Sequence, residues 1–161
     1  MATVSLPEGL KIRPARASDS SAVTTLVFGI LQSFGFTPDP SGTDADLANL
    51  EATYPMSGGC FLIVETSAGE IVGCCGLLPL KDNEFELRKM YLASRYRGLG
   101  IGAKLLRMII AEARHRNAKR NILETAFDLK DAMKLYERNG FHPVQREKMA
   151  ARCDVIMALE L

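Results

Sequence analysis

The spacing of apolar residues predicts an N-terminal strand followed by an amphipathic helix. Residues 10–14 alternate apolar and polar side chains and end at Pro14, as expected of a short edge strand. In residues 20–33 apolar side chains recur every three or four positions, which is the period of one helix face. Asp19 stands directly before this run and is expected to cap the helix. The apolar face would consist of Val23, Leu26, Val27, Ile30 and Leu31.

The next part of the chain predicts a loop, a shorter helix and consecutive strands. Residues 34–42 are rich in glycine and proline, so we expect a loop there. A shorter helix is expected to start near Thr43 or Asp44. Strand-like runs follow at residues 60–66, 70–78 and 85–92. A short glycine-containing segment separates the first two of these runs, which is typical of an antiparallel hairpin.

The C-terminal part predicts two helices among three strands. Residues 101–116 form the clearest helix, because apolar side chains recur there every four positions. Asp128 is expected to cap a second helix that ends at Arg138. The strands are expected at residues 121–126, 141–146 and 152–161. This order of elements predicts one α/β domain with a mixed sheet over residues 10–161, preceded by a flexible N-terminus at residues 1–9.

Composition narrows the class of protein. A length of 161 residues corresponds to one ordinary domain, and a net charge of +1 argues against nucleic-acid partners and anionic membranes. The chain contains no apolar run of the roughly 18–20 residues that span a bilayer, and residues 1–7 do not resemble a signal peptide. Its cysteines lack the spacing of a zinc site, so no metal is expected and reduced thiols are favoured. We therefore expect a cytoplasmic protein. The cysteines are Cys60, Cys74, Cys75 and Cys153.

A glycine-rich segment is the strongest sign of chemistry. Gly98, Gly100 and Gly102 lie between the strand at 85–92 and the helix at 101–116. Glycine allows a ligand to approach the backbone, and the start of a helix offers unpaired amides and the positive end of the helix dipole. The segment is therefore expected to bind a phosphate or pyrophosphate, with Arg97 adding a positive charge.

Two other interpretations of this segment are weaker. Gly98, Gly100 and Ala103 satisfy the dinucleotide pattern G-x-G-x-x-A, and Glu124 lies about twenty residues further on. However, residues 93–97 separate the first glycine from its strand, and too few residues follow for a dinucleotide-binding domain. A simple glycine turn leading into a helix would not need three alternate glycines.

Three motifs together resemble one family. The pattern Arg97-x-x-Gly100-x-Gly102 matches the R/Q-x-x-G-x-G/A pyrophosphate loop of the GCN5-related N-acetyltransferase (GNAT) superfamily. Residues 86–92 resemble the strand that precedes this loop, and residues 132–141 are similar to the segment A-x-x-L-Y-x-x-x-G-F. The resemblance covers residues 10–161. It implies a single-domain α/β acetyltransferase fold: a mixed, mostly antiparallel sheet of about six to seven strands, with two splayed central parallel strands and about four flanking helices.

The resemblance also implies a binding site for the donor acetyl-CoA. Its pyrophosphate would rest on backbone amides of the glycine segment, and its pantetheine arm would pair with the backbone of the strand at 85–92. The residues expected to bind it are Met90, Tyr91, Leu92, Arg97, Gly98, Leu99, Gly100, Ile101, Gly102 and Ala103.

Two residues match catalytic positions of the family. Glu86 resembles the glutamate base of some members, with a salt bridge to Arg88 as its alternative role. Glu84, Glu124 or water alone could serve as the base instead. Tyr136 matches the tyrosine that protonates the departing CoA thiolate, with a place in the core as its alternative.

One position departs from the pattern of the family. Leu129 stands where an asparagine is usual, so Asp128 or Lys130 would have to supply the corresponding hydrogen bond to the pantetheine arm.

The resemblance implies transfer of acetyl from acetyl-CoA to the primary amine of a small molecule or amino-acid-like acceptor, by direct attack on the thioester. A protein N-terminal or lysine acetyltransferase, and a CoA-binding module without turnover, are the alternatives; homodimerisation is left open. The acceptor is expected in residues 28–58, where aromatic rings and carboxylates would suit a cationic amine. The acceptor-binding residues would be Phe28, Phe34, Phe36 and Asp39.

Overall fold

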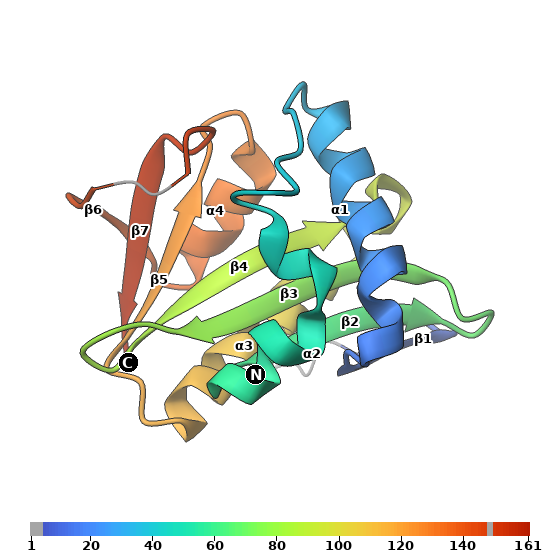
Figure 1. Cartoon of the computed structure of the whole chain (residues 1–161), viewed down its shortest axis with the longest axis horizontal. Coiled ribbons are helices and arrows are strands. Elements are labelled where there is room, and N and C mark those ends of the chain that lie inside the picture. The colour runs from blue at the N-terminus through green and yellow to red at the C-terminus, as the bar shows by residue number, and fades with distance from the viewer. Residues whose placement is uncertain (1–4, 148–149) are drawn as a thin grey trace.

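A computed structural model describes residues 5–147 and 150–161, and over these residues the chain forms one seven-stranded sheet (Figure 1). The strands lie in the order β1-β2-β3-β4-β5-β7-β6, and β4 and β5 are parallel while the other neighbours are antiparallel. This mixed sheet confirms the expected fold class. The strands are β1 Leu10–Pro14, β2 Cys60–Thr66, β3 Ile71–Pro79, β4 Glu84–Leu92, β5 Arg120–Thr125, β6 His142–Val144 and β7 Val155–Glu160.

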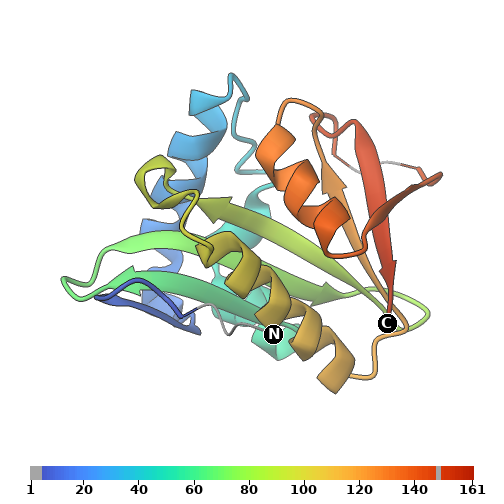
Figure 2. The ribbon, with the colours of Figure 1, turned by 180° about the vertical axis from the view of Figure 1, so that it is seen from behind.

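Helices cover both faces of the sheet. The α-helices of the described residues are α1 Ser20–Ser33, α2 Leu50–Thr53, α3 Ile101–His115 and α4 Lys130–Arg138. Helices α1 and α2 lie on the face seen in Figure 1, and α3 and α4 lie on the face seen in Figure 2. Adjacent Cys74 and Cys75 belong to the two separate apolar clusters beneath these helix pairs. Neighbouring side chains of β3 therefore point to opposite faces, as strand geometry requires.

The two parallel strands separate along their length. Their pairing runs from Glu84 opposite Arg120 to Leu87 opposite Leu123 and stops there, although β4 continues to Leu92. A β-bulge follows at Lys89, whose φ of 54° is left-handed. Because a bulge bends its strand, β4 turns away from β5 and leaves a gap in the middle of the sheet (Figure 1).

The prediction of one helix starting near Thr43 or Asp44 is wrong. The chain instead forms a 3₁₀ turn at Ala45–Ala48, followed by the single turn of α2. Leu47, Leu50 and Tyr54 are all buried against α1 and the sheet. Packing of these side chains thus holds two short turns where the apolar spacing suggested one longer helix.

Two expected helix caps are also corrected. The carboxylate of Asp19 accepts hydrogen bonds from the Arg13 guanidinium at 2.8 and 3.0 Å and from the Arg16 amide at 2.6 Å, and makes no capping bond to α1. The second helix begins at Lys130, with Leu129 rather than Asp128 in the capping position. In the first case a partly buried arginine is the stronger partner for the carboxylate.

The ends of the chain differ in detail from the expectation. Strands β6 and β7 are shorter than the expected 141–146 and 152–161, since β6 pairs with β7 at three positions and β7 pairs with β5 at six. Residues 1–4 of the expected flexible N-terminus, and residues 148–149, lie outside the described residues, while Leu6 packs against the main core. Within the described ranges, no helix combines the length and the apolar character needed to cross a membrane.

Candidate active site

A cavity of about 920 Å³ occupies the gap between β4 and β5. The start of α3 and helix α4 contribute to its walls on one face of the sheet, and Thr43 and Arg152 contribute on the other. The cavity therefore passes from one face of the sheet to the other. Of the catalytic candidates it contains Glu86, Glu124 and Tyr136.

The glycine segment forms one end of this cavity. Gly98 and Gly100 have left-handed φ angles of 75° and 80°, and α3 begins directly after them. Within the described residues, the amides of residues 98–103 donate to no backbone carbonyl. These amides and the positive end of the α3 dipole form a cradle that suits the pyrophosphate of acetyl-CoA.

Most of the expected donor-binding residues line the cavity. Two others have side chains that point elsewhere: Leu99 is 49% exposed to solvent, and Ile101 is buried in the core beneath α3. Only the backbone of these two residues can serve a ligand. The expected residues that do line the cavity are Met90, Tyr91, Leu92, Arg97, Gly98, Gly100, Gly102 and Ala103.

Arg97 is fixed at the rim of the cavity. Its Nε donates to the carbonyl of Leu92 at 2.9 Å, and its guanidinium lies 5.4 Å from the ring centroid of Phe34. The arginine thus connects the glycine segment to the end of α1, and it keeps further N–H groups that can face a phosphate.

Tyr136 lies on the inner side of α4. It is 5% exposed, and its ring packs against Phe141 with centroids 5.9 Å apart. Burial raises the pKa of the Tyr136 phenol well above its ordinary value. The hydroxyl therefore stays protonated at neutral pH and is available as a hydrogen-bond and proton donor.

Glu86 reaches the cavity from β4. Burial raises the pKa of its carboxyl, and the positive charge of Arg88, whose Nε lies 4.0 Å from Oε1, opposes that change. The negative charge of Glu124 adds to the increase. A carboxylate with a raised pKa binds a proton more readily, as a general base must. The alternative Glu84 lies outside the cavity and pairs with Arg146 at 2.7 Å.

Sequence reasoning missed a buried network of charges beside Glu86. The Arg152 guanidinium donates two hydrogen bonds to Asp44, at 2.7 and 2.9 Å, and the Lys89 ammonium lies 3.2 Å from both Asp44 and Asp46. Arg88 donates to the carbonyl of Thr43 at 2.9 Å. Charged residues among the apolar residues of β4 were the available signal, but Arg88 lies 45 positions from Thr43, and Arg152 lies 108 positions from Asp44.

The expected acceptor residues are only partly brought together. Phe34 lines the cavity, whereas Phe28 and Phe36 pack against the core beneath α1. Asp39 accepts a hydrogen bond from the Thr43 amide at 2.9 Å and holds its own loop in place. The structure thus leaves Phe34 as the expected acceptor residue that faces the cavity.

The start of α4 borders the cavity as well. Leu129, which replaces the usual asparagine, lines it together with Asp128 and Lys130. Both polar candidates for the missing hydrogen bond are therefore placed where they could provide it.

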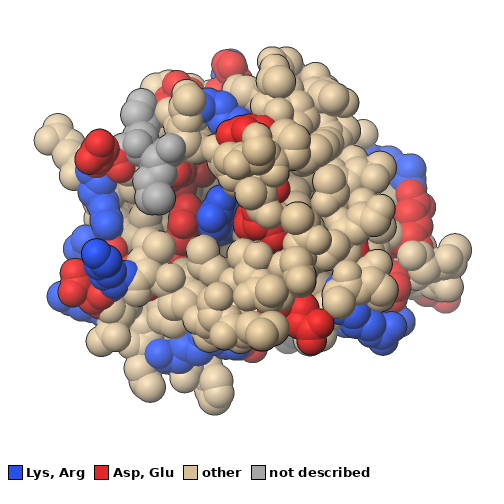
Figure 3. All heavy atoms as spheres, in the orientation of Figure 1, with Lys and Arg blue, Asp and Glu red and all other residues tan. Residues whose placement is uncertain are grey.

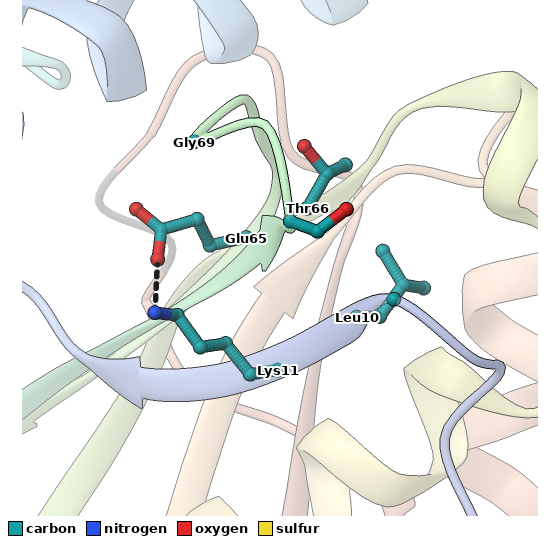
Figure 4. Close-up of a pocket in the computed structure, with 7 residues that line it drawn as sticks. Leu10, Lys11, Glu65, Thr66 and Gly69 are labelled. Atoms are coloured by element: carbon teal, nitrogen blue, oxygen red, sulfur yellow. Dashed lines mark ion pairs between the residues drawn. The ribbon is translucent and has the colours of Figure 1, made fainter.

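A second hollow, of about 370 Å³, lies away from these residues at the start of β1 and the β2–β3 turn (Figure 4). Its charged pair, Lys11 and Glu65, is joined at 3.0 Å, and Arg13 also binds Glu65 at 3.0 Å. These groups satisfy one another, so we assign the hollow no chemical role.

Comparison with known proteins gives the same family as the motifs. The model of the Acetyltransferase (GNAT) family matches residues 27–141. The Escherichia coli K12 protein named "Uncharacterized N-acetyltransferase YjgM" is 35% identical over 143 residues, which are 86% of this chain and 85% of the relative.

Solved structures share the architecture. A GNAT-family acetyltransferase from Staphylococcus aureus Mu50 superimposes with a TM-score of 0.87 at 27% identity, covering 94% of this chain and 98% of that one. The Salmonella typhimurium protein yncA, solved with its cofactor acetyl-CoA, superimposes with a TM-score of 0.73 at 21% identity, covering 95% of this chain and 94% of that one. This similarity supports the fold alone. From the matched family and the relatives, the chain belongs to the acetyltransferase (GNAT) family and is an N-acetyltransferase.

Proposed function

We propose that the enzyme transfers the acetyl group of acetyl-CoA to the primary amine of a small molecule or an amino-acid-like acceptor. The observation that carries the proposal is the cavity through the sheet, with a cradle of free amides at one end and Glu86 and Tyr136 beside its middle. The volume of the whole cavity, about 920 Å³, falls within the usual range for a pocket that holds one drug-sized ligand. A bound donor would therefore leave room for a small acceptor only.

The donor half would hold acetyl-CoA through backbone groups. The amides of residues 98–103 would bind the pyrophosphate, and the unpaired edge of β4 beyond Leu87 would pair with the amides of the pantetheine arm. When bound, acetyl-CoA supplies a thioester that is activated towards amines. Its arm would lead into the gap between the parallel strands.

The catalytic residues would move two protons. Glu86, directly or through water, accepts a proton from the amine while the amine nitrogen forms its bond to the acetyl carbon. Tyr136 donates its proton to the sulfur as the carbon–sulfur bond breaks, so the products are the acetylated amine and CoA. Exchange with solvent then removes the proton from Glu86 and restores the one on Tyr136. The Tyr136 phenol is protonated at neutral pH, and burial raises the pKa of Glu86, which makes its carboxylate a stronger base.

The proposal is tested by release of CoA thiol from acetyl-CoA in the presence of a panel of small primary amines. Release faster than in the absence of acceptor, with at least one small amine, is the expected result. Turnover confined to peptide amines would favour a protein acetyltransferase. Stable binding of CoA without turnover on any acceptor would leave only a binding module.

A further inference from the structure

An ion pair joins the two halves of the sheet across the α1 side of the gap. Asp44 belongs to the segment that packs on β4, where Lys89 binds its carboxylate. Arg152 belongs to the segment that leads into β7 and is tied to β5, because the Asp154 amide donates to the Thr125 carbonyl at 2.9 Å. The Asp44–Arg152 pair therefore spans the opening between the strands.

This connection is rigid. Both oxygens of the Asp44 carboxylate accept from the guanidinium, at 2.7 and 2.9 Å, a two-point geometry that fixes orientation as well as distance. The side chain of Asp44 has no exposed surface, and the Asp39 amide donates to it at 2.8 Å. Solvent thus has little access to the pair, and breaking it would remove the two-point contact that fixes the buried carboxylate.

The pair stands where an acceptor must enter. Arg152 and Thr43 line the same cavity as Glu86, and they do so from the face opposite to Tyr136. Figure 3, drawn from this side, shows a hollow near the middle of the face in which basic atoms lie between acidic ones. An amine approaching Glu86 from the α1 side has to pass beside the guanidinium.

We propose that Arg152 is a specificity-determining residue: held across the opening by Asp44, it admits small free amines and excludes amines carried on a polypeptide. The inference rests on the proposed function and deepens it by giving the size class of the acceptor a structural cause. A polypeptide attached to the amine cannot follow it through an opening that a rigid ion pair spans.

The substitution Arg152→Gln opens the crossing and leaves Lys89 to neutralise Asp44. The matched control is Arg146→Gln, which also removes an arginine–carboxylate pair, with Glu84 at 2.7 Å, but outside the cavity. Two pairs of probes are compared for kcat/KM: glycinamide with a short peptide that begins with glycine, and Nα-acetyl-lysine amide with a short peptide that contains lysine.

For Arg152→Gln we expect the ratio of kcat/KM for peptide to that for free amine to rise by about tenfold or more, within the usual range of pocket discrimination. The ratio should stay at the parent value in Arg146→Gln. Should Arg152→Gln fail to fold, Arg152→Lys, which keeps the charge but not the two-point contact, is expected to show the same change at smaller size.

An unchanged ratio in an active Arg152 variant, or a parent enzyme that prefers the peptides, overturns the inference and leaves acetyl transfer intact. Absence of turnover on every acceptor in the parent and the variants overturns the proposed function, and the inference with it.

Discussion

Glu86 and Tyr136 reach one cavity from opposite faces of the sheet. The neighbours of Glu86 in β4, Phe85 and Leu87, belong to the core under α3, so the Glu86 side chain points to the α1 side. Tyr136 belongs to the α3 side through α4. A thioester placed in the gap between β4 and β5 would thus have a base on one side and an acid on the other.

Replacement of Tyr136 by phenylalanine should reduce kcat and leave binding of CoA nearly unchanged. Only the hydroxyl is lost, and the ring can keep its contact with Phe141. A general acid contributes about 10²–10⁴ to the rate, so a loss of tenfold or more is expected in steady-state kinetics. Equal kcat values in the two proteins would assign Tyr136 to the core alone.

Replacement of Glu86 by glutamine should change the pH dependence of the rate. A general base works in its ionised form, so the rate should rise as the pH passes the pKa of Glu86. Because burial raises this pKa, that rise should lie above the pH at which an ordinary glutamate ionises. The rise should be absent in Glu86→Gln. A profile of kcat/KM against pH that is identical in both proteins would point to Glu124 or to water.

Replacement of Gly100 by valine should abolish stabilisation of the protein by CoA. A side chain is strained at its φ of 80° and would obstruct the amides of the cradle. At a CoA concentration of a hundred times Kd, the parent should gain about 2.7 kcal/mol in the free energy of unfolding. Gly102→Ala is the matched control, because its added carbon would meet Leu135 at an ordinary 3.5 Å. Equal stabilisation of the Gly100 variant and the parent would refute the cradle.

Replacement of Phe34 by alanine should raise KM for the acceptor by about two- to thirtyfold, the equivalent of roughly 0.5–2 kcal/mol for a ring beside a cation. Phe36→Ala, which removes a ring from the core under α1, should lower thermal stability and leave KM near the parent value. If both variants keep the parent KM for the best amine of the panel, the acceptor lies against other residues.

The contribution of Arg152 to stability should depend on pH. Burial acts to raise the pKa of Asp44, but hydrogen bonds from Arg152 and the Asp39 amide and the charge of Lys89 outweigh it and lower the pKa to about 2. The unfolded chain has the ordinary value of 3.8, so this stabilisation is complete above about pH 4 and is lost as the pH falls towards 2. The difference in unfolding free energy between the parent and Arg152→Gln, measured in urea, should shrink over that range. A constant difference would mean that the Asp44 carboxylate is not its cause.

Local patterns in the sequence predicted the elements that have a regular period. The helix at 20–33 and the strand at 60–66 have the expected bounds. The helix presents one apolar face to the core beneath it, and the strand is a short apolar run buried on both faces of the sheet. The glycine segment could be recognised because the residues of its motif are neighbours in the sequence.

What could not be predicted depends on contacts between distant segments. Asp19 has the position of a helix cap, but a guanidinium from β1 takes its carboxylate. Arg152 and Asp44 are separated by 108 positions, and no period in the sequence relates them. Phe28, which was expected at the acceptor site, packs against the core instead of lining the cavity, because an aromatic residue near a loop can face either one.

Lys89, whose backbone is left-handed, couples the shape of β4 to the segment that carries Asp44 and Asp46. Its backbone forms the bulge at which β4 turns away from β5, and its side chain binds Asp44 and Asp46 of the segment beside the cavity. An acceptor loop transplanted from another enzyme would therefore have to bring carboxylates at the positions of Asp44 and Asp46. Without them, the buried ammonium of Lys89 would lack a compensating charge in β4. A substitution intended to change acceptor selectivity would then be expected to weaken the binding of CoA as well.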